Sequence, residues 1–311
     1  MARKPAQIHG VLCVDKPLGW TSRDVVNKVG HLLGERRCGH CGTLDPEASG
    51  LLLVAFGDAS KLMRWFMQAH KTYETTIEFG SETLTDDAAG PVLRTAPVPT
   101  LDRQIIEAAL PQPGEILQVP PAVSALQHEG VRDHERVRRG ETLEREPRQV
   151  WLGDVEILEI EDNSATLRIT CGAGFYIRSL ARDLGRALQS AAHVRTLRRV
   201  AASGFGVQEG TTIEALLALD DVARRGLVLP LVNAGQRVLP LLPVDNEVVV
   251  ALRQGKTPVV ATAGLDWLGV GPAHCLVVDP DDQAVCVAEL LADGTTRVER
   301  GMAYVQAAAD D

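Results

Sequence analysis

The sequence predicts an α+β protein built in two parts, a large first part and a small β-rich part at the C-terminal end. Two observations predict this arrangement. Several segments alternate between apolar and polar residues, as strands do, and they are interspersed with segments whose apolar residues recur at helical spacing. After a proline-marked seam at residues 239–243 the chain becomes acidic and carries mainly short strand-like segments. We therefore expect one domain over residues 1–240 and a second over residues 241–311, which is long enough to fold alone.

Composition predicts a soluble globular protein of the cytoplasm. The chain is 45% hydrophobic and 23% charged, which is ordinary for that class. No apolar run approaches the roughly 18 residues of a membrane span, and the N-terminus lacks the apolar core of a signal peptide. Six cysteines in 311 residues do not resemble a disulfide framework. We expect no membrane or protein partner, and a monomer.

The charge is unevenly distributed, and this keeps a polyanionic partner possible. The net charge of −9 alone argues against nucleic-acid binding. Residues 241–311 hold four basic and eleven acidic residues, whereas residues 178–199 hold six arginines and one acid. Because phosphate contacts act over a Debye length of roughly 8–10 Å, a basic strip on an acidic protein can still bind a polyanion.

The first elements surround a loop that is rich in glycine. Residues 11–14 read as a strand, and Thr21 or Ser22 can cap a helix that runs to Gly34. Residues 51–56 form an apolar run that is typical of a buried strand. The segment between the helix and this strand, residues 37–50, is expected to be a shaped loop.

Later segments supply the remaining strands and helices. We expect helices over residues 61–68 and 101–110, and strands over residues 73–79, 150–160 and 165–171. In the C-terminal part we expect one helix over residues 247–253 and strands over residues 274–279 and 284–290.

One further helix, which follows Gly174, carries arginines at a regular spacing. Its apolar residues predict one buried face, while Arg178, Arg182 and Arg186 repeat at i+4 along another face.

The glycine-rich loop contains several side chains that could carry chemistry. Cys38 and Cys41 form a Cys-x-x-Cys pair, which in redox enzymes lies between a strand and a helix. Here Gly42 and Pro46 follow the pair and prevent a regular helix, and no second close cysteine pair completes a zinc site. Two incidental thiols are therefore the simpler interpretation, and we expect no metal.

Asp45 precedes Pro46, a pairing that is also common in ordinary turns. A lone carboxylate can act as a nucleophile or as an electrostatic anchor, and in either role it needs a fixed cation nearby. The arginine-bearing helix could supply that cation. His40 in the same loop is more often structural in such a position, and Tyr73 could either pack in the core or stack on one base.

At this point the residues resemble a known family. Gly39-His-Cys-Gly-Thr-Leu-Asp-Pro-Glu-Ala-Ser-Gly50 is similar to the Gly-His-x-Gly-x-Leu-Asp-Pro-x-Ala-[Ser/Thr]-Gly signature of the TruB family, the bacterial tRNA pseudouridine-55 synthases. Further segments resemble the family in the same order along the chain, over residues 15–22, 71–73, 120–126, 174–180 and 193–199.

The resemblance implies a pseudouridine-synthase-like catalytic domain around a central mixed, mostly antiparallel sheet, followed by a PUA-like RNA-binding domain. It implies isomerisation of one uridine, position 55 in the T-arm loop of tRNA, to pseudouridine, with no cofactor or metal. The target base must first be flipped out of its stack. The tRNA partner would be recognised at its T-arm stem-loop, with the strip at residues 178–199 contacting phosphates.

The resemblance also implies site residues, which are the residues of this sequence at the matching positions of the family's motifs. Asp45 matches the essential aspartate, Arg178 its arginine partner, and Tyr73 the tyrosine that stacks on the target base. His40 matches the histidine that fills the space left by the flipped base. Three more residues match positions that support or adjoin the site: Lys16, Tyr176 and Leu197.

The sequence also departs from the family pattern, and other functions remain to be compared. Val123 stands where many members carry tyrosine, and the acidic C-terminal part weakens the case for strong phosphate binding there. The alternatives are a thiol-disulfide oxidoreductase that uses Cys38 and Cys41, or a non-catalytic RNA-binding protein.

Overall fold

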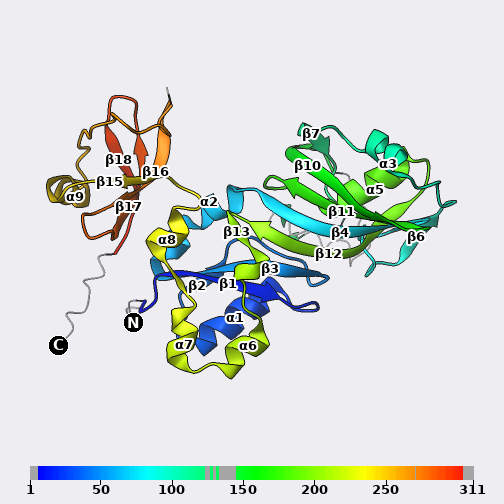
Figure 1. The fold of residues 1–311 in the computed structure, drawn as a ribbon, viewed down its shortest axis with the longest axis horizontal. Helices are drawn as coiled ribbons and strands as arrows, with labels where there is room; N and C mark the ends of the chain where they lie inside the picture. The colour runs from blue at the N-terminus through cyan, green and yellow to red at the C-terminus, as the bar shows by residue number, and fades with distance from the viewer. Residues whose placement is uncertain (1–5, 123–126, 129–130, 133–144, 270, 304–311) are drawn as a thin grey trace.

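The computed structural model describes residues 6–122, 127–128, 131–132, 145–269 and 271–303 (Figure 1). Its main feature is a ten-stranded sheet, in which all pairs are antiparallel except the parallel pair of β3 and β12. This confirms the expected mixed, mostly antiparallel sheet and the α+β class. Along the sheet the order is β14 (Leu229–Pro230), β1 (Gly10–Lys16), β3 (Ala48–Phe56), β12 (Ala192–Ala202), β4 (Lys71–Phe79), β11 (Ser164–Cys171), β10 (Arg148–Ile160) and β7 (Gly114–Gln118), with β2 (Cys38–His40) on β3 and β13 (Phe205–Gly206) on β12.

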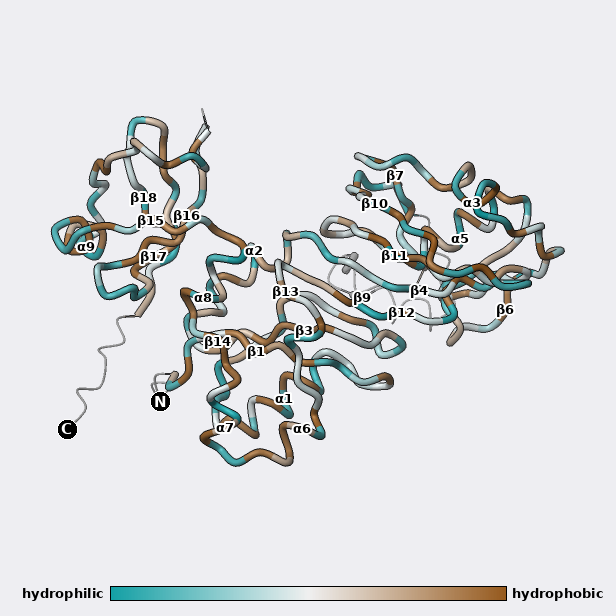
Figure 2. The backbone as a smooth tube through the Cα atoms, in the orientation of Figure 1, coloured by the Kyte–Doolittle hydropathy of each residue, from teal (hydrophilic) through white to brown (hydrophobic). Residues whose placement is uncertain are grey.

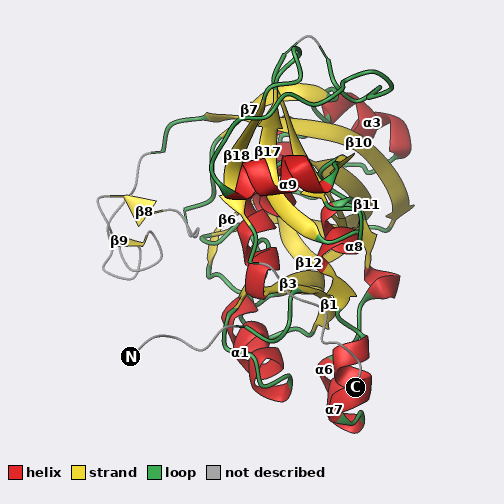
Figure 3. Cartoon of the chain, turned by 90° about the vertical axis from the view of Figure 1, so that its left-hand side faces the viewer, coloured by secondary structure: helices red, strands yellow, loops and turns green. Residues whose placement is uncertain are grey.

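Helix α1 (Ser22–Leu32) begins where the sequence predicts. The hydroxyl of Thr21 accepts from the backbone amide of Asp24, whose carboxylate accepts from the amide of Thr21, so the two residues form a capping box. The apolar face of the helix packs on β1 and β3, whose hydrophobic runs are brown in Figure 2. Helices α6 (Ile213–Ala218) and α7 (Asp221–Gly226), which the sequence did not predict, lie beside α1 below the sheet (Figure 3).

Helix α5 (Ile177–Ala187) covers the other half of the sheet. Its buried residues Ile177, Leu180, Ala181 and Leu184 pack against β4, β11 and β12, which confirms the expected apolar face. Helix α3 (Arg103–Ala109) inserts Ile106 into the same core. This packing fixes the first turn of α5 beside the loop that precedes β3.

Short elements connect the sheet to its surroundings. A 3-10 helix, η1 (Gly57–Leu62), leads into α2 (Met63–Gln68), where one helix was expected. The hairpin of β5 (Ser81–Thr83) and β6 (Val92–Thr95) follows β4, and β8 (Gln127–His128) pairs with β9 (Val131–Arg132). A second 3-10 helix, η2 (Val207–Glu209), follows β13, and α8 (Leu231–Gly235) follows β14.

The C-terminal part forms a separate four-stranded sheet that starts at the predicted seam. Its order is β15 (Leu241–Pro243), β16 (Ala273–Val278), β17 (Ala284–Leu290) and β18 (Thr296–Gly301), and α9 (Asn246–Arg253) packs on one face. The other face shares a core with α2 of the first part, where Phe66 packs with residues that include Leu276 and Val287. The β-rich character is confirmed.

No helix in the described ranges has the length and apolar character needed to cross a membrane.

Candidate active site

The loop that carries Asp45 connects β2 to β3 and is held from both sides. The backbone amide of Leu44 donates to Ser22 Oγ at 2.8 Å, and this hydroxyl donates to the carbonyl of Leu44 at 3.0 Å. On the other side of Asp45, the carbonyl of Pro46 accepts from the amide of Gly19 at 2.9 Å. The loop is therefore fastened to the start of α1 and to the turn before it.

Lys16 lies beneath this loop, fully buried. Its ammonium group donates to the carbonyls of Trp20 at 2.7 Å and Pro17 at 2.9 Å, and reaches Pro46 at 3.5 Å. Burial lowers the pKa of Lys16 from 10.5 to about 8, against the opposing effect of the Asp45 carboxylate. Lys16 thus joins the turn before α1 to the Asp45 loop without reaching the open face of the loop.

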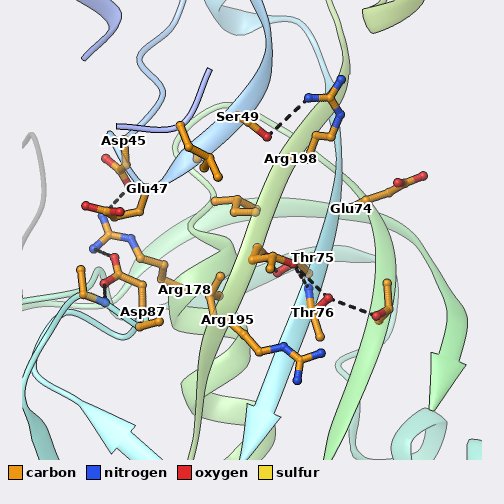
Figure 4. Close-up of a pocket in the computed structure, with 18 residues that line it drawn as sticks. Asp45, Glu47, Ser49, Glu74, Thr75, Thr76, Asp87, Arg178, Arg195 and Arg198 are labelled. Carbon is orange, nitrogen blue, oxygen red and sulfur yellow. Dashed lines mark hydrogen bonds and ion pairs between the residues drawn. The ribbon is translucent and has the colours of Figure 1, made fainter. Parts of the chain in front are cut away.

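Arg178, at the start of α5, supplies the cation that Asp45 needs. The guanidinium lies 2.8 Å from Asp45 Oδ2 and 3.5 Å from Asp87 Oδ2 (Figure 4). It also donates to the carbonyl of Thr85 at 2.8 Å. Arg178 is buried, whereas the Asp45 side chain is 39% exposed. One fixed arginine therefore compensates two carboxylates, of which Asp45 is the accessible one.

Two hollows meet at this ion pair. One, of about 450 Å³, is lined by residues that include Lys71, Tyr73 and Tyr176. The other, of about 540 Å³ and drawn in Figure 4, extends over the sheet past the threonines of β4 and β12. The residues that line both are Asp45, Ala48, Arg178 and Leu197.

Tyr73 and Arg199 form the floor of the first hollow. Burial raises the pKa of Tyr73, and the Arg199 guanidinium beside it acts in the opposite direction. Arg199 is itself buried and donates to the carbonyls of Leu51 at 2.7 Å and Gly42 at 3.2 Å. It therefore ties β12 to the Asp45 loop.

His40 lies at the end of β2 and lines neither hollow. Its Nδ1 is buried and makes no hydrogen bond among the described atoms. Burial, Arg199 and Arg23 together lower the pKa of His40 from its ordinary value, which favours the neutral imidazole.

The structure thus brings five of the seven predicted residues to one place. Around the first hollow lie Asp45, Tyr73, Tyr176, Arg178 and Leu197. Lys16 lies below them and His40 to one side. Sequence reasoning did not single out Asp87 and Arg199, because a turn aspartate and one arginine of a basic strip carry no distinguishing signal.

The helical part of the basic strip does not form a phosphate-binding surface, and that expectation is wrong. Arg182 is buried and pairs with Asp86 at 3.0 Å, and Arg186 pairs with Glu82. The reason is that the hairpin of β5 and β6, with Glu82 and Asp86, lies against α5. The charge of Arg182 is therefore neutralised in the interior, and Arg186 is exposed but already paired.

Cys38 and Cys41 belong to different cores. Cys41 is buried on one side of the sheet, and Cys38 packs against the α1 side. Residues three apart in an extended chain point in opposite directions, so the two thiols do not face each other. Both are free thiols, and burial raises the pKa of Cys41 to about 12 and that of Cys38 above its usual value. This arrangement gives no support to redox catalysis.

No group of three or more His, Cys, Asp or Glu side chains within the described ranges is placed to hold a metal ion.

Solved structures share the fold of this chain. The Cbf5 chain of a Cbf5–Nop10–Gar1 complex matches with a TM-score of 0.71 at 24% identity, covering 94% of this chain and 84% of that chain. An archaeal box H/ACA Nop10–Cbf5 complex matches with a TM-score of 0.70 at 23% identity, covering 94% and 86%. At this identity the likeness concerns the fold alone.

Sequence comparisons identify the enzyme class. Residues 30–177 match the model of the TruB family pseudouridylate synthase N-terminal domain, and residues 178–234 match that of the tRNA pseudouridylate synthase B C-terminal domain. The protein is therefore a pseudouridine synthase, an isomerase.

Curated relatives named tRNA pseudouridine synthase B are similar over most of their length. The protein from Paracoccus denitrificans is 44% identical over 74% of this chain and 78% of its own. The protein from Ruegeria pomeroyi is 41% identical over 83% and 86%, and that from Burkholderia lata is 42% identical over 77% and 74%. The chain belongs to the TruB family.

Proposed function

We propose that this enzyme isomerises uridine to pseudouridine in tRNA, and that its target is uridine 55 in the T-arm loop. Relatives named tRNA pseudouridine synthase B support the tRNA substrate. The observation that carries the catalytic proposal is the 2.8 Å ion pair of Asp45 and Arg178 in the wall of a hollow that two tyrosines also line.

The reaction needs a carboxylate beside the sugar. The N1–C1′ bond breaks, the freed uracil turns, C5 bonds to C1′, and the C5 proton is lost while N1 gains one. Asp45 can add to C1′ and later leave it, or it can take the C2′ proton to give a glycal and later return it. Both routes start from an ionised carboxylate, which the Arg178 guanidinium favours.

The remaining residues hold the base while it turns. In this proposal Tyr73 stacks on the uracil, and Leu197 and Tyr176 close the apolar side of the hollow, which excludes water from the cleaved glycosidic bond. Lys16 holds the turn before α1 and the carbonyl of Pro46, next to Asp45, in place through its contacts. These residues bind and position, whereas Asp45 reacts.

Entry of the base requires base flipping, at a free-energy cost of a few kcal/mol for unstacking. We assign His40 to the space that the base leaves in the RNA. A neutral imidazole suits that role, because it can stack between bases without burying a charge.

We also propose how the chain divides into domains, and in which oligomeric state and compartment the enzyme acts. Residues 1–240 form the catalytic domain, and residues 241–311 form a PUA-like domain that contributes weak RNA contacts or stability. The start of the second sheet at Leu241 supports this boundary. The enzyme acts as a monomer in the cytoplasm, as expected for a tRNA-modifying protein whose composition is that of an ordinary globular chain.

The decisive test uses the Asp45→Asn variant, which keeps the shape of the side chain and removes its charge. An unmodified tRNA transcript is incubated with enzyme, and pseudouridine is located by chemical labelling. We expect labelling at position 55 by the wild type, none by Asp45→Asn, and RNA affinity within a few-fold of the wild type.

Two controls define the target. A transcript with cytidine at position 55 should remain unlabelled, and label at any other uridine would contradict the T-arm assignment. Substantial turnover by Asp45→Asn would remove Asp45 from the chemistry. Binding without any pseudouridine would favour the non-catalytic alternative.

A further inference from the structure

A groove of about 480 Å³ lies beside α1, outside the two hollows of the active site. It is formed by the outer face of α1 and the turn that leads into β2, on the lower side of the sheet in Figures 1 and 3. Its lining includes Arg23, Asn27, His31, Arg36 and Cys38. The isomerase chemistry assigned above makes no use of this groove.

Basic side chains around the groove have no acidic partner. Arg23, Arg36 and Arg37 are exposed, and within the described part of the chain neither they nor Lys28 form an ion pair or a side-chain hydrogen bond. By contrast, the helical arginines Arg182 and Arg186 are paired internally. Three exposed arginines without an ion pair among the described residues therefore lie close together at residues 23–37, where an anionic ligand can reach them.

Acidic groups at the groove are already engaged by backbone amides. The buried carboxylate of Glu35 accepts from the amides of Gln7 at 2.9 Å and Arg37 at 2.8 Å. Asp24 accepts from the amide of Thr21 at 3.0 Å in the capping box. These carboxylates stabilise the helix start and the turn, and they do not pair with the arginines.

The groove begins next to the active-site loop and continues away from it. Arg23 follows Ser22, whose hydroxyl donates to the carbonyl of Leu44 in the Asp45 loop. Cys38 in the lining lies two residues before His40, so this end of the groove adjoins the residue assigned to the RNA. At the other end His31 and Gly34 also line a hollow of about 290 Å³ against Arg225. Eleven residues of α1 extend over roughly 16 Å.

We propose that this groove binds the sugar-phosphate backbone of the tRNA segment that adjoins the loop whose uridine enters the Asp45 hollow. The inference rests on the proposed function. Arg23 and Arg36 bind phosphate oxygens through their planar guanidinium groups, and Asn27 donates to phosphate or ribose oxygens. The contacts carry no sequence information, and they fix the register of the RNA so that one nucleotide reaches Asp45.

The test compares two double variants that remove the same charge. Arg23→Gln with Arg36→Gln alters the groove, whereas Arg103→Gln with Arg148→Gln removes two exposed arginines of α3 and β10, away from α1 (Figure 1). The dissociation constant for an unmodified tRNA transcript is measured for both variants over a series of KCl concentrations.

The groove variant should bind about 10- to 50-fold more weakly at 0.1 M salt, and the slope of log Kd against log salt should fall by about 2, one unit per lost phosphate contact. The control variant should match the wild type. Equal losses in both variants would mean that only total charge matters, and an unchanged slope would mean that these arginines do not meet phosphates. Either outcome overturns the inference.

The experiments distinguish a failure of the proposed function from a failure of the groove proposal. If the wild type forms no pseudouridine at position 55, the proposed function fails whatever the binding data show. If the wild type is active and the groove variant binds like the control, only the inference fails.

A second readout does not depend on affinity. Arg23→Gln removes a positive charge near His40, so the pKa of His40 should rise, as NMR titration of the free protein would measure. In the RNA complex of the wild type, Arg23 is screened by phosphate, so His40 should also titrate higher than in the free protein. No difference between the free and bound proteins would count against the placement of phosphate at Arg23.

Discussion

Replacing Lys16 by methionine tests whether Lys16 mainly positions the Asp45 loop or mainly stabilises the fold. The change keeps the length of a fully buried side chain and removes its ammonium group. Two well-formed hydrogen bonds, to the carbonyls of Trp20 and Pro17, are lost, together with the longer contact to Pro46. The carbonyl of Pro46 then keeps the amide of Gly19 as its partner.

The two effects on the free energy of unfolding nearly cancel. Loss of two hydrogen bonds from a charged donor costs about 4 kcal/mol in total. Burial lowers the pKa of Lys16 from 10.5 to about 8, and relief of that penalty returns about 3 kcal/mol at neutral pH. We expect a net destabilisation of about 1 kcal/mol. Turnover should fall at least about tenfold, because a small displacement of Asp45 misaligns the reacting atoms.

The pH dependence has a definite sign. In the folded protein Lys16 loses its proton near pH 8, whereas in the unfolded chain it keeps the proton to about pH 10.5. The unfolded chain therefore binds more protons in this interval, and the wild type gains stability relative to Lys16→Met as the pH rises from 8 to 10.5. This additional stability of the wild type is complete above pH 10.5, and it is lost as the pH falls from 10.5 through 8.

Urea unfolding at pH 7 and pH 10 and single-turnover pseudouridine formation measure these quantities. A destabilisation above about 3 kcal/mol with unchanged turnover would refute the reasoning, because Lys16 would then serve the fold and not the loop. If the difference in free energy of unfolding between the wild type and Lys16→Met does not change with pH, the assigned cost of burying the Lys16 ammonium group is refuted.

Three further changes test other parts of the site. Tyr73→Ala should lose turnover far more than Tyr73→Phe, because stacking needs the ring, and equal activity of both with the wild type would remove Tyr73 from the site. Cys38→Ser with Cys41→Ser should leave RNA modification nearly unchanged, and loss of an insulin-reducing activity present in the parent would instead favour redox catalysis. Gly50→Ala should destabilise the fold by about 3 kcal/mol or more, because Gly50 has φ +102° and a Cβ would lie 2.3 Å from the Arg199 carbonyl oxygen. Thermal unfolding of Gly50→Ala close to that of the wild type would contradict the close packing of β3 on β12.

Local sequence patterns predicted most of the regular structure. The helix cap at Thr21 or Ser22, the apolar run at residues 51–56 and the apolar face of α5 are all short-range signals, and the structure confirms each element. The unpredicted helices α6, α7 and α8 have five or six residues each, too few to show a helical period.

Long-range pairing could not be read from the sequence in the same way. A cation for Asp45 was expected from the arginine-bearing helix, and Arg178 provides it. The acidic turn at Asp86 and Asp87 lies against the same helix only because β4 and α5 pack together, and no local pattern reports that contact. The phosphate-binding expectation for α5 failed for this reason, since it counted charges along the chain without their partners in space.

The core that the C-terminal sheet shares with α2 has a consequence for how the molecule unfolds. Phe66 is fully buried and Trp65 nearly so, and the core around them is completed in part by Leu276, Val278 and Val287 from the far end of the chain. Loss of the second sheet would open this surface to water, and so would loosening of α2. The two parts are therefore coupled in free energy, and the molecule should melt as one cooperative unit. The C-terminal sheet thus helps to maintain the enzyme's scaffold even where it contacts no RNA.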